Sequence, residues 1–347
     1  MKLSNFVLWL WNKKFSILFS MIFVVMIIFG ILIISQNSKP KISMTLRLNW
    51  ILYAEHTPFY VALDKGYYLK EGIDLEILPG AGSNLTTALV EKNEYEIGYS
   101  SAPSIINAVD KGAQIKAIAG ICQHDTSSFI FRKDANIKTV QDLVGKRIAL
   151  SIGDAQTSFL YNVLPKMGLS RDSLKVVEFP NAITKENAIF TKDADVLSGY
   201  YLDQVARLKN RYKIELDFIK FTDYGIDNLS SALVTSTYFI NQHPDLVRGF
   251  LKATQKGIAF MIEHPEQSAD IFYKYVKTAS REDVEKTIKL FIPLLHTPNS
   301  EGRRLGWTSP KDWIETREKT VGKKLDDDLD ESWVNIYFTN EFLSDIY

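Results

Sequence analysis

Residues 44–84 read MTLRLNWILYAEHTPFYVALDKGYYLKEGIDLEILPGAGSN, and this stretch decides the fold class. Apolar and polar residues alternate over residues 44–50, a period of two that predicts a β-strand. Thr57 and Pro58 then begin a helix, with Thr57 as the N-cap and Pro58 in the first turn. The sequence therefore opens its globular part with a strand followed by a helix.

The same stretch continues with a second strand and a glycine-rich loop. Apolar residues alternate again over residues 73–77, and the loop at 80–84 leads into another helical segment. Strands and helices in strict succession are typical of an α/β domain with a mainly parallel sheet. A second such series begins near residue 140, and the chain becomes helical from His243 onward. The pattern predicts an α/β fold with two lobes and a ligand cleft between them.

Composition narrows the class of function. The chain has 347 residues, with 41 Lys plus Arg and 41 Asp plus Glu, so its formal net charge is zero. A neutral chain of this length fits two domains and gives no electrostatic reason to expect a nucleic acid partner. The single cysteine, Cys122, cannot form an internal disulfide, and no zinc-like spacing occurs. We expect no metal site, and we expect Cys122 to be a buried thiol.

The N-terminus carries a long uncharged apolar run over residues 15–34. About 20 apolar residues span a bilayer core, and no small-residue cleavage motif follows them. We therefore expect a cytoplasmic stub at 1–14, a transmembrane anchor at 15–34 and a linker at 35–43. A cleaved signal peptide is the alternative.

Polar and aromatic side chains recur at the predicted strand ends, where open α/β sheets bind their ligands. Trp50 also fits a core position, Ser101 fits a helix cap, and His56 fits a hydrogen-bonded loop residue. Because acid–base pairs are lacking while aromatic, amide and hydroxyl groups recur, we expect binding of a flat heterocycle and no catalytic residue. The predicted ligand-binding residues are Asn49, Trp50, His56, Ser83, Ser100, Ser101, Gln123, His124, Asp154, Tyr200 and Tyr201.

Short motifs along most of the chain suggest a family. They are residues 48–50 (LNW), 56–62 (HTPFYVA), 65–68 (KGYY), 71–75 (EGIDL), 96–99 (EIGY), 111–112 (KG), 123–124 (QH), 142–146 (DLVGK) and 339–343 (TNEFL). With these motifs the sequence resembles the thiamine pyrimidine synthase-like family. That family includes periplasmic proteins that bind thiamine-pyrimidine precursors and an enzyme that makes the pyrimidine.

The resemblance implies a type II periplasmic-binding fold whose chain crosses between the lobes twice. It implies lobe 1 at 44–131 and 225–347, and lobe 2 at 132–224. It also implies a periplasmic or extracellular location, and an ABC transporter permease and ATPase as partners.

The sequence differs from the synthase branch of this family at the residues that carry out the synthase reaction. The lysine that holds pyridoxal phosphate and the histidine that is consumed correspond to Ser100 and Ser104. The cysteine-rich iron motif corresponds to residues 228–235, which contain no cysteine. Without that amine no Schiff base forms, so no cofactor is expected. Tyr201 stands where pyrimidine-binding relatives have a glutamate that contacts the ring.

Three functions remain open from the sequence. The leading interpretation is the substrate-binding component of an ABC importer, which takes a small heterocyclic metabolite. The second is a thiamine pyrimidine synthase-like enzyme. The third is an anchored small-molecule sensor, although about 14 residues before the apolar run are too few for an output domain.

Overall fold

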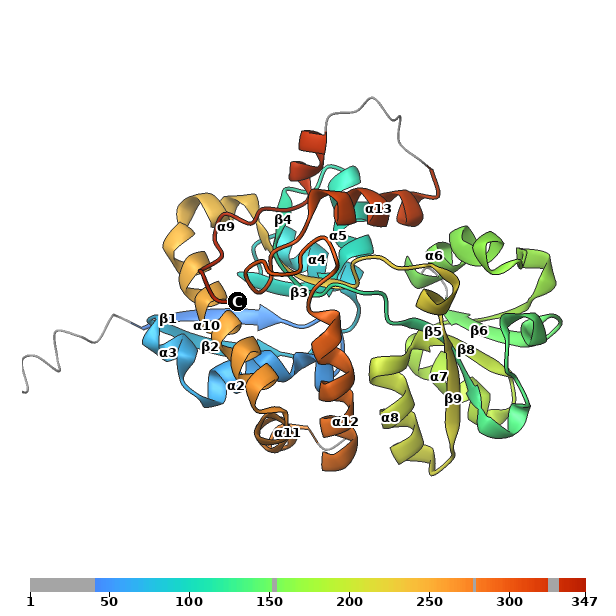
Figure 1. Cartoon of the computed structure of the whole chain (residues 1–347). Coiled ribbons are helices and arrows are strands. Elements are labelled where there is room, and N and C mark those ends of the chain that lie inside the picture. Colours follow the sequence, from blue (N-terminus) through green and yellow to red (C-terminus); the bar gives the residue numbers. More distant parts are fainter. Residues whose placement is uncertain (1–40, 152–154, 277–278, 324–330) are drawn as a thin grey trace, which may run out of the picture. The chain divides into compact units, whose positions relative to one another are not determined.

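The computed structural model describes residues 41–151, 155–276, 279–323 and 331–347 (Figure 1). The globular unit from Ser43 to Tyr347 contains two five-stranded sheets. The predicted anchor at 15–34 lies outside the described residues. No helix within the described ranges is long and apolar enough to cross a membrane.

The first sheet has the strand order β2-β1-β3-β10-β4, and we call it and its helices lobe 1. Strands β1 and β3 are parallel, whereas β10 is antiparallel to both β3 and β4. Strands β1, β3 and β4 thus run in one direction, as expected for a mainly parallel sheet, and β10 runs against them. Its elements before the first crossing are β1 (Ile42–Arg47), α2 (Thr57–Asp64), α3 (Tyr67–Lys70), β2 (Ile73–Leu78), α4 (Ser83–Glu91), β3 (Ile97–Ser101), α5 (Ala102–Asp110) and β4 (Ile115–Cys122).

The second sheet has the order β7-β6-β8-β5-β9, and we call it and its helices lobe 2. Strand β6 is parallel to both of its neighbours, and β5 is antiparallel to β8 and β9. The elements are β5 (Ser127–Arg132), β6 (Arg147–Ser151), α6 (Ala155–Val163), β7 (Lys175–Phe179), α7 (Ala182–Thr191), β8 (Val196–Tyr200), α8 (Tyr201–Tyr212) and β9 (Leu216–Lys220).

The chain crosses between the sheets twice, at residues 123–126 and 225–230, which we call the crossing segments. The sequence placed the first boundary at 131/132, but β5 belongs to the second sheet, so this crossing comes earlier. After the second crossing the chain returns to lobe 1 as a strand followed by helices, as expected for the region beyond His243. These elements are β10 (Ser231–Ser236), α9 (Thr237–Gln242), α10 (Pro244–Glu263), α11 (Pro265–Tyr273), α12 (Arg281–Phe291) and α13 (Pro310–Val321).

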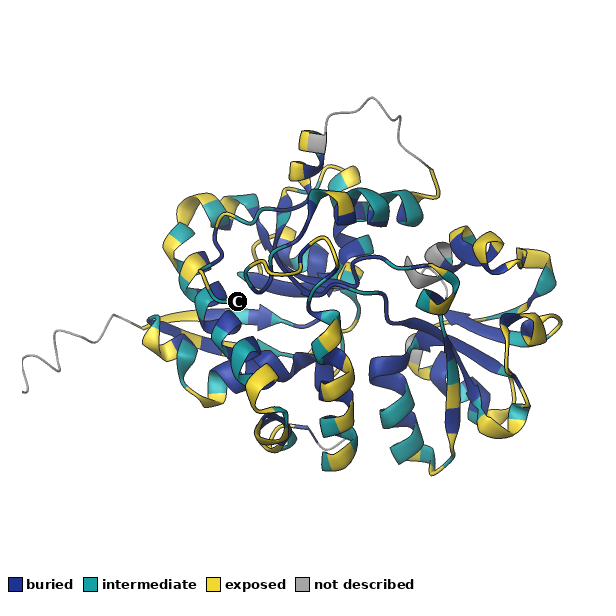
Figure 2. Cartoon of the chain, in the orientation of Figure 1, coloured by how far each residue is buried: buried dark blue, intermediate teal, exposed yellow. Residues whose placement is uncertain are grey.

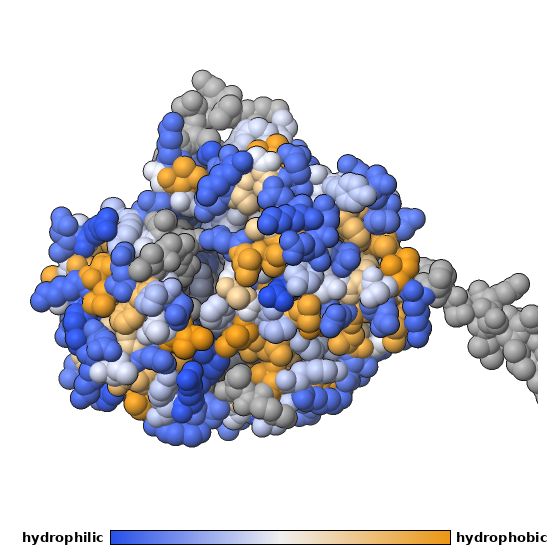
Figure 3. All heavy atoms as spheres, turned by 180° about the vertical axis from the view of Figure 1, so that it is seen from behind, coloured by the Kyte–Doolittle hydropathy of each residue, from blue (hydrophilic) through white to orange (hydrophobic). Residues whose placement is uncertain are grey.

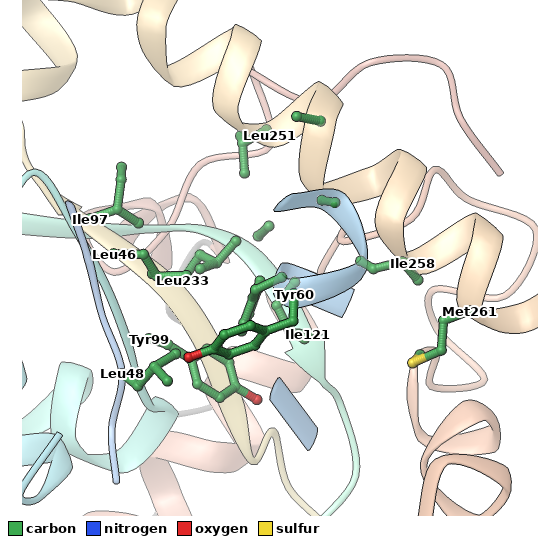
Figure 4. Packing of buried hydrophobic residues seen from close by; sticks show 14 of the residues in the cluster. Leu46, Leu48, Tyr60, Ile97, Tyr99, Ile121, Leu233, Leu251, Ile258 and Met261 are labelled. Atoms are coloured by element: carbon green, nitrogen blue, oxygen red, sulfur yellow. The ribbon is translucent and has the colours of Figure 1, made fainter. Parts of the chain in front are cut away.

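Each lobe has its own apolar core. In lobe 1, strand residues such as Leu46 and Leu233 pack with helix residues such as Tyr60 and Ile258 (Figure 4). In lobe 2, Phe129 and Ile148 belong to a separate cluster. Figure 2 shows the strands as the most buried parts of both lobes, and Figure 3 shows hydrophobic residues scattered among hydrophilic ones on one face. Two cores joined by two short segments leave the strand ends of both lobes available for a site.

Candidate functional site

A cavity of about 470 Å³ lies at the carboxyl ends of β1, β3, β6 and β8. Both lobes and both crossing segments line it, which is the position predicted from open α/β sheets. The lining residues are Asn49, Trp50, Tyr53, Glu55, Ala81, Gly82, Ser83, Asn84, Leu85, Ser101, Pro103, Ser104, Asp125, Thr126, Ser127, Ser151, Pro180, Asn181, Lys185, Glu186, Tyr200, Asp203, Gln204, Asn228, Ser230 and Ser231.

The loop after β1 and the glycine-rich loop together form one wall. The N–H groups of Gly80 and Gly82 donate to the carbonyls of Trp50 and Asn49, at 2.9 and 2.8 Å. Gly82 has φ 129°, a backbone conformation that side chains disfavour, so glycine is required there. These bonds hold Asn49 and the half-buried Trp50 at the cavity surface, as predicted.

Behind this wall His56 is buried and neutral. Its Nδ1 accepts from the Tyr53 N–H at 3.4 Å, and its Nε2 lies 2.8 Å from Asn49 Oδ1. One nitrogen accepts and the other donates, as in a neutral imidazole. Burial lowers the pKa of His56 to about 3. His56 therefore positions Asn49 and does not itself line the cavity, unlike the prediction.

Glu55 is a buried carboxyl at the cavity, and it is not among the eleven predicted ligand-binding residues. It is 2% exposed and accepts a hydrogen bond from the hydroxyl of Tyr99. Burial raises its pKa to about 7, although the hydrogen bonds from Tyr99 and Tyr53 act in the opposite direction. At neutral pH the cavity thus contains a carboxyl group close to its midpoint of ionisation.

The serines at the starts of α4 and α5 have different positions. Ser83 and Ser101 line the cavity, and the Ser101 N–H donates to Ser83 Oγ at 3.0 Å. Ser101 also caps α5, so both of its predicted roles are compatible. Ser100 is fully buried, bonds to Thr87 and does not line the cavity, because successive residues of a strand face opposite sides. Ser104 does line it.

The first crossing segment contributes Asp125 rather than the predicted Gln123 and His124. Gln123 is buried, and its amide donates to the carbonyls of Leu295 and Trp307. His124 bonds instead to Asp227 on the other crossing segment. Neither residue is among the lining residues, because the side chains of both form hydrogen bonds away from the cavity.

Asp125 is 3% exposed, and its Oδ1 accepts from the Ser127 N–H and hydroxyl at 3.1 and 2.8 Å. Burial is the main cause that raises its pKa to about 7. Its backbone N–H donates to Asp227 Oδ1 at 2.9 Å, so this bond ties one crossing segment to the other.

Lobe 2 contributes a buried charged network. The guanidinium of Arg207 donates to both oxygens of Glu186 and to both oxygens of Asp203, at distances of 2.7 to 2.9 Å. Gln204 also donates to Glu186, at 2.8 Å. Glu186, Asp203 and Gln204 line the cavity together with Lys185, which is 3% exposed. Buried charges of this kind are tolerated because each carboxylate has a cationic hydrogen-bond partner.

The two adjacent tyrosines face different environments. Tyr200 lines the cavity, and its N–H donates to Gln204 Oε1 at 2.6 Å. Tyr201 is not a lining residue: its ring stacks on Phe218, with centroids 5.1 Å apart and an interplanar angle of 3°. Tyr201 begins helix α8 and belongs to the buried apolar cluster of lobe 1, so it packs against lobe 1 as well as on Phe218 of β9. The structure therefore places Tyr201 outside the cavity lining, unlike the prediction.

Of the predicted residues, the structure brings Asn49, Trp50, Ser83, Ser101 and Tyr200 together at the cavity. Asp154 lies outside the described residues. The ionisable lining residues that are not among the predicted ligand-binding residues are Glu55, Asp125, Lys185, Glu186 and Asp203. Glu55 and Asp125 adjoin the predicted His56 and His124, whereas Lys185 and Glu186 lie inside helix α7, where no local pattern marks a site. Within the described ranges, no group of histidine, cysteine and carboxylate side chains could hold a metal ion.

Comparisons with known proteins place this chain in a family. The family model described as NMT1/THI5 like matches residues 53–268. A protein of Legionella pneumophila named 4-amino-5-hydroxymethyl-2-methylpyrimidine phosphate synthase is 27% identical, over 89% of this chain and 94% of that relative. The riboflavin-binding protein RibY of Chloroflexus aurantiacus is 25% identical, over 89% of this chain and 88% of RibY.

Solved structures agree on the fold. The alkanesulfonate-binding protein SsuA of Xanthomonas axonopodis pv. citri, bound to MOPS, superposes with a TM-score of 0.63 at 13% sequence identity. The match covers 81% of this chain and 92% of SsuA. The chain therefore belongs to the NMT1/THI5-like family and has the α/β fold of the periplasmic binding proteins.

Proposed function

We propose that this protein is the substrate-binding component of an ABC importer and binds a small heterocyclic metabolite, similar to a thiamine pyrimidine precursor. The observation that carries this proposal is the cavity itself, whose walls come from both lobes and from both crossing segments. A ligand held there contacts both lobes at once, so its binding favours one arrangement of the lobes that a permease can recognise.

The lining supports a flat, polar ligand. A volume of about 470 Å³ fits a small molecule, and the aromatic rings of Trp50, Tyr53 and Tyr200 lie among hydroxyl and amide groups. Aromatic rings stack on heterocycles, while amides and hydroxyls bond to their edges. The names of the relatives include a riboflavin-binding and a formylaminopyrimidine-binding protein, and both ligands are nitrogen heterocycles.

The binding of small molecules, and any chemical change in them, is measured in one experiment. The purified protein is titrated with 4-amino-5-hydroxymethyl-2-methylpyrimidine, riboflavin and MOPS in a calorimeter. Each probe is then recovered, and its molecular mass is measured by mass spectrometry. We expect saturable binding of a heterocyclic probe and recovery of that probe with its mass unchanged. A chemically altered probe would refute the carrier function.

The location outside the cytoplasm, and the tether formed by residues 15–34, are part of this proposal. The uncharged run and the lack of a cleavage motif support an uncleaved anchor beside the permease and ATPase. Intact-mass analysis of protein extracted from membranes should show Met1 or Lys2 still present. A mature N-terminus near Asn37 would refute the anchor but leave the extracytoplasmic location standing.

A pyrimidine synthase is the second candidate, and two observations favour it. Lys185 lines the cavity, and the relative from Legionella pneumophila is named as the synthase. The lining fits pyridoxal phosphate only in part: Lys185 is a lysine that could form an imine, but no described histidine lines the cavity. Borohydride reduction with pyridoxal phosphate, followed by peptide mapping, tests this candidate. A pyridoxyl group on Lys185 would support the synthase, and an unmodified Lys185 would support the carrier.

A further inference from the structure

Three buried polar atoms without a hydrogen-bond partner belong to residues that line the cavity. Across the described residues, these atoms are Asp125 Oδ2, Asn228 Oδ1 and Ser151 Oγ. Buried polar atoms in folded proteins nearly always have a partner. Eight exceptions occur among the described residues, and the three at the cavity are those next to a space that a ligand can fill. Two of the three, on Asp125 and Asn228, are oxygen atoms that accept.

The orientation of both side chains is fixed by bonds on their other atom. Oδ1 of Asp125 accepts from the N–H and hydroxyl of Ser127, so its Oδ2 is the oxygen left for another donor. Nδ2 of Asn228 donates to the carbonyl of Leu229 at 3.1 Å, which leaves its Oδ1 as the available acceptor. Asn228 therefore presents an acceptor oxygen, and Asp125 presents one in its ionised form.

The two acceptors come from the two crossing segments, which are bonded to each other. The Asp125 N–H donates to Asp227 Oδ1 at 2.9 Å, and the Ser230 N–H donates to the Cys122 carbonyl at 3.0 Å. These bonds hold the two crossing segments together, and Asp125 lies on one of them and Asn228 on the other. A ligand donor that bonds to both acceptors therefore contacts both segments.

The charges around the cavity disfavour an anion. Four lining residues carry carboxyl groups, namely Glu55, Asp125, Glu186 and Asp203, against the single amine of Lys185. Arg207 lies next to them, but its guanidinium is committed to Glu186 and Asp203. With Lys185 and Arg207 balanced against those two carboxylates, Glu55 and Asp125 remain as further acidic groups. Burial raises the pKa of each to about 7, and any ionised fraction repels an anionic ligand.

We propose that Asp125 and Asn228 form an acceptor subsite that selects a nitrogen heterocycle with an amino or amidine group over an anion such as a sulfonate. This inference rests on the proposed function, and it names the chemical class of the substrate. The amino group donates to Asp125 Oδ2 and Asn228 Oδ1 while the ring occupies the space beside Trp50. A sulfonate offers only acceptors and leaves both oxygens without a partner.

The test uses the full-length protein and matched probes. The amino probe is 4-amino-5-hydroxymethyl-2-methylpyrimidine, and its partner is the same ring with hydrogen in place of the 4-amino group. Butane-1-sulfonate, which has no amine, serves as the anion. Affinities are measured by calorimetry for the wild type, Asp125→Asn and Asn228→Leu. Asp172→Asn, an exposed aspartate far from the lining set, is the matched control. Asp125→Asn keeps the Oδ1 acceptor for Ser127, so the variant retains the local bonds.

We expect the wild type to bind the amino probe at least tenfold more tightly than either other probe. Asp125→Asn should lower that affinity tenfold or more and reduce the preference over the hydrogen analogue to less than threefold. Asn228→Leu should act in the same direction, and Asp172→Asn should match the wild type. Binding of butane-1-sulfonate or of the hydrogen analogue as tightly as the amino probe would overturn the subsite and leave the carrier function intact. A preference unchanged in Asp125→Asn would also overturn it, whereas a chemically altered probe would overturn the proposed function itself.

Discussion

Nδ1 of His124 lies 2.5 Å from Oδ2 of Asp227, and this pair joins the two segments that cross between the lobes. Nε2 of His124 faces the carbonyl of His296 at 2.8 Å, so both ring nitrogens meet acceptors. This arrangement suits the protonated imidazole. The hydrogen bond to Asp227 is the main cause that raises the pKa of His124 above its ordinary value of 6.5.

The pair predicts a pH dependence of stability. Because the pKa of His124 is higher in the folded protein than in the unfolded chain, protonated His124 stabilises the fold below pH 6.5. This stabilisation is lost as the pH rises through the pKa that His124 has in the folded protein. Burial raises the pKa of Asp227, but the bonds from His124 and the Asp125 N–H, together with the charges of His124 and Lys319, outweigh burial and leave the pKa below 3.8. The contribution of the pair to stability therefore also fades in stronger acid. The side chains are 21% and 42% exposed, so we expect less than about 1 kcal/mol.

Urea unfolding of wild type and His124→Gln, measured from pH 4 to pH 9, tests this prediction. The difference in the free energy of unfolding should be largest near pH 5 and should shrink above pH 7. His264→Gln, at an exposed site, is the control and should follow the wild type at every pH. A difference that grows with rising pH would contradict the assignment.

Trp50 and Tyr201 should respond differently to truncation. Trp50→Ala removes a lining aromatic and should weaken ligand binding by about tenfold or more, equivalent to about 1.4 kcal/mol. Tyr201→Ala removes a buried ring stacked on Phe218 and should lower the free energy of unfolding by about 3 kcal/mol, with affinity nearly unchanged. Calorimetry and urea unfolding of both variants check this. Equal losses of affinity would place Tyr201 in the site after all.

Arg207 should be a large contributor to the stability of lobe 2. Arg207→Met leaves the buried carboxylates of Glu186 and Asp203 without their cation, which should cost about 3–5 kcal/mol. Arg132→Met is the matched control, because its partner Asp134 is 65% exposed and loss of the pair should change stability little. Thermal unfolding at neutral pH compares the two. Similar unfolding temperatures for both variants would contradict this account of the network.

Glu55 should make the folded protein less stable as the pH rises. Burial is the main cause that raises the pKa of Glu55 from 4.5 to about 7. As the pH rises, the unfolded chain therefore loses this proton at a lower pH than the folded protein does. The contribution of Glu55 to the free energy of unfolding is fully present below pH 4.5. It falls by about 3 kcal/mol as the pH rises to 7.

Glu55→Gln should remove that loss, and urea unfolding at pH 4.5 and pH 8 measures the difference. Glu76→Gln, at an exposed position, should keep the wild-type dependence. Parallel curves for wild type and Glu55→Gln would show that the carboxyl is ionised in both states.

The sequence predicted the strands with clear alternation, but it missed β5 and β10. Both follow a crossing segment, both run antiparallel to their neighbours and both are almost wholly buried, so neither alternates in polarity. Without β5 the first lobe boundary was predicted too late. A buried strand has no period of two to reveal it, and its direction depends on the rest of the chain.

For the site, strand ends were informative where a side chain follows a parallel strand directly, as for Asn49, Trp50 and Tyr200. The prediction was wrong where a neighbour in sequence faces the other side, as for Ser100, or packs on another element, as for Tyr201. Lys185 and Glu186 were missed because they lie within α7 and reach the cavity through the packing of that helix on β6. Only tertiary structure brings them there.

Native mass spectrometry of the full-length protein, purified without added ligand, tests the central claim most directly. We predict an unmodified nitrogen heterocycle bearing an amino group, bound one per chain and largely lost from Trp50→Ala. Asp172→Asn should retain it. A pyridoxyl adduct on Lys185, or a bound molecule whose amount is the same in Trp50→Ala, would contradict the proposal that this cavity binds a small molecule for transport.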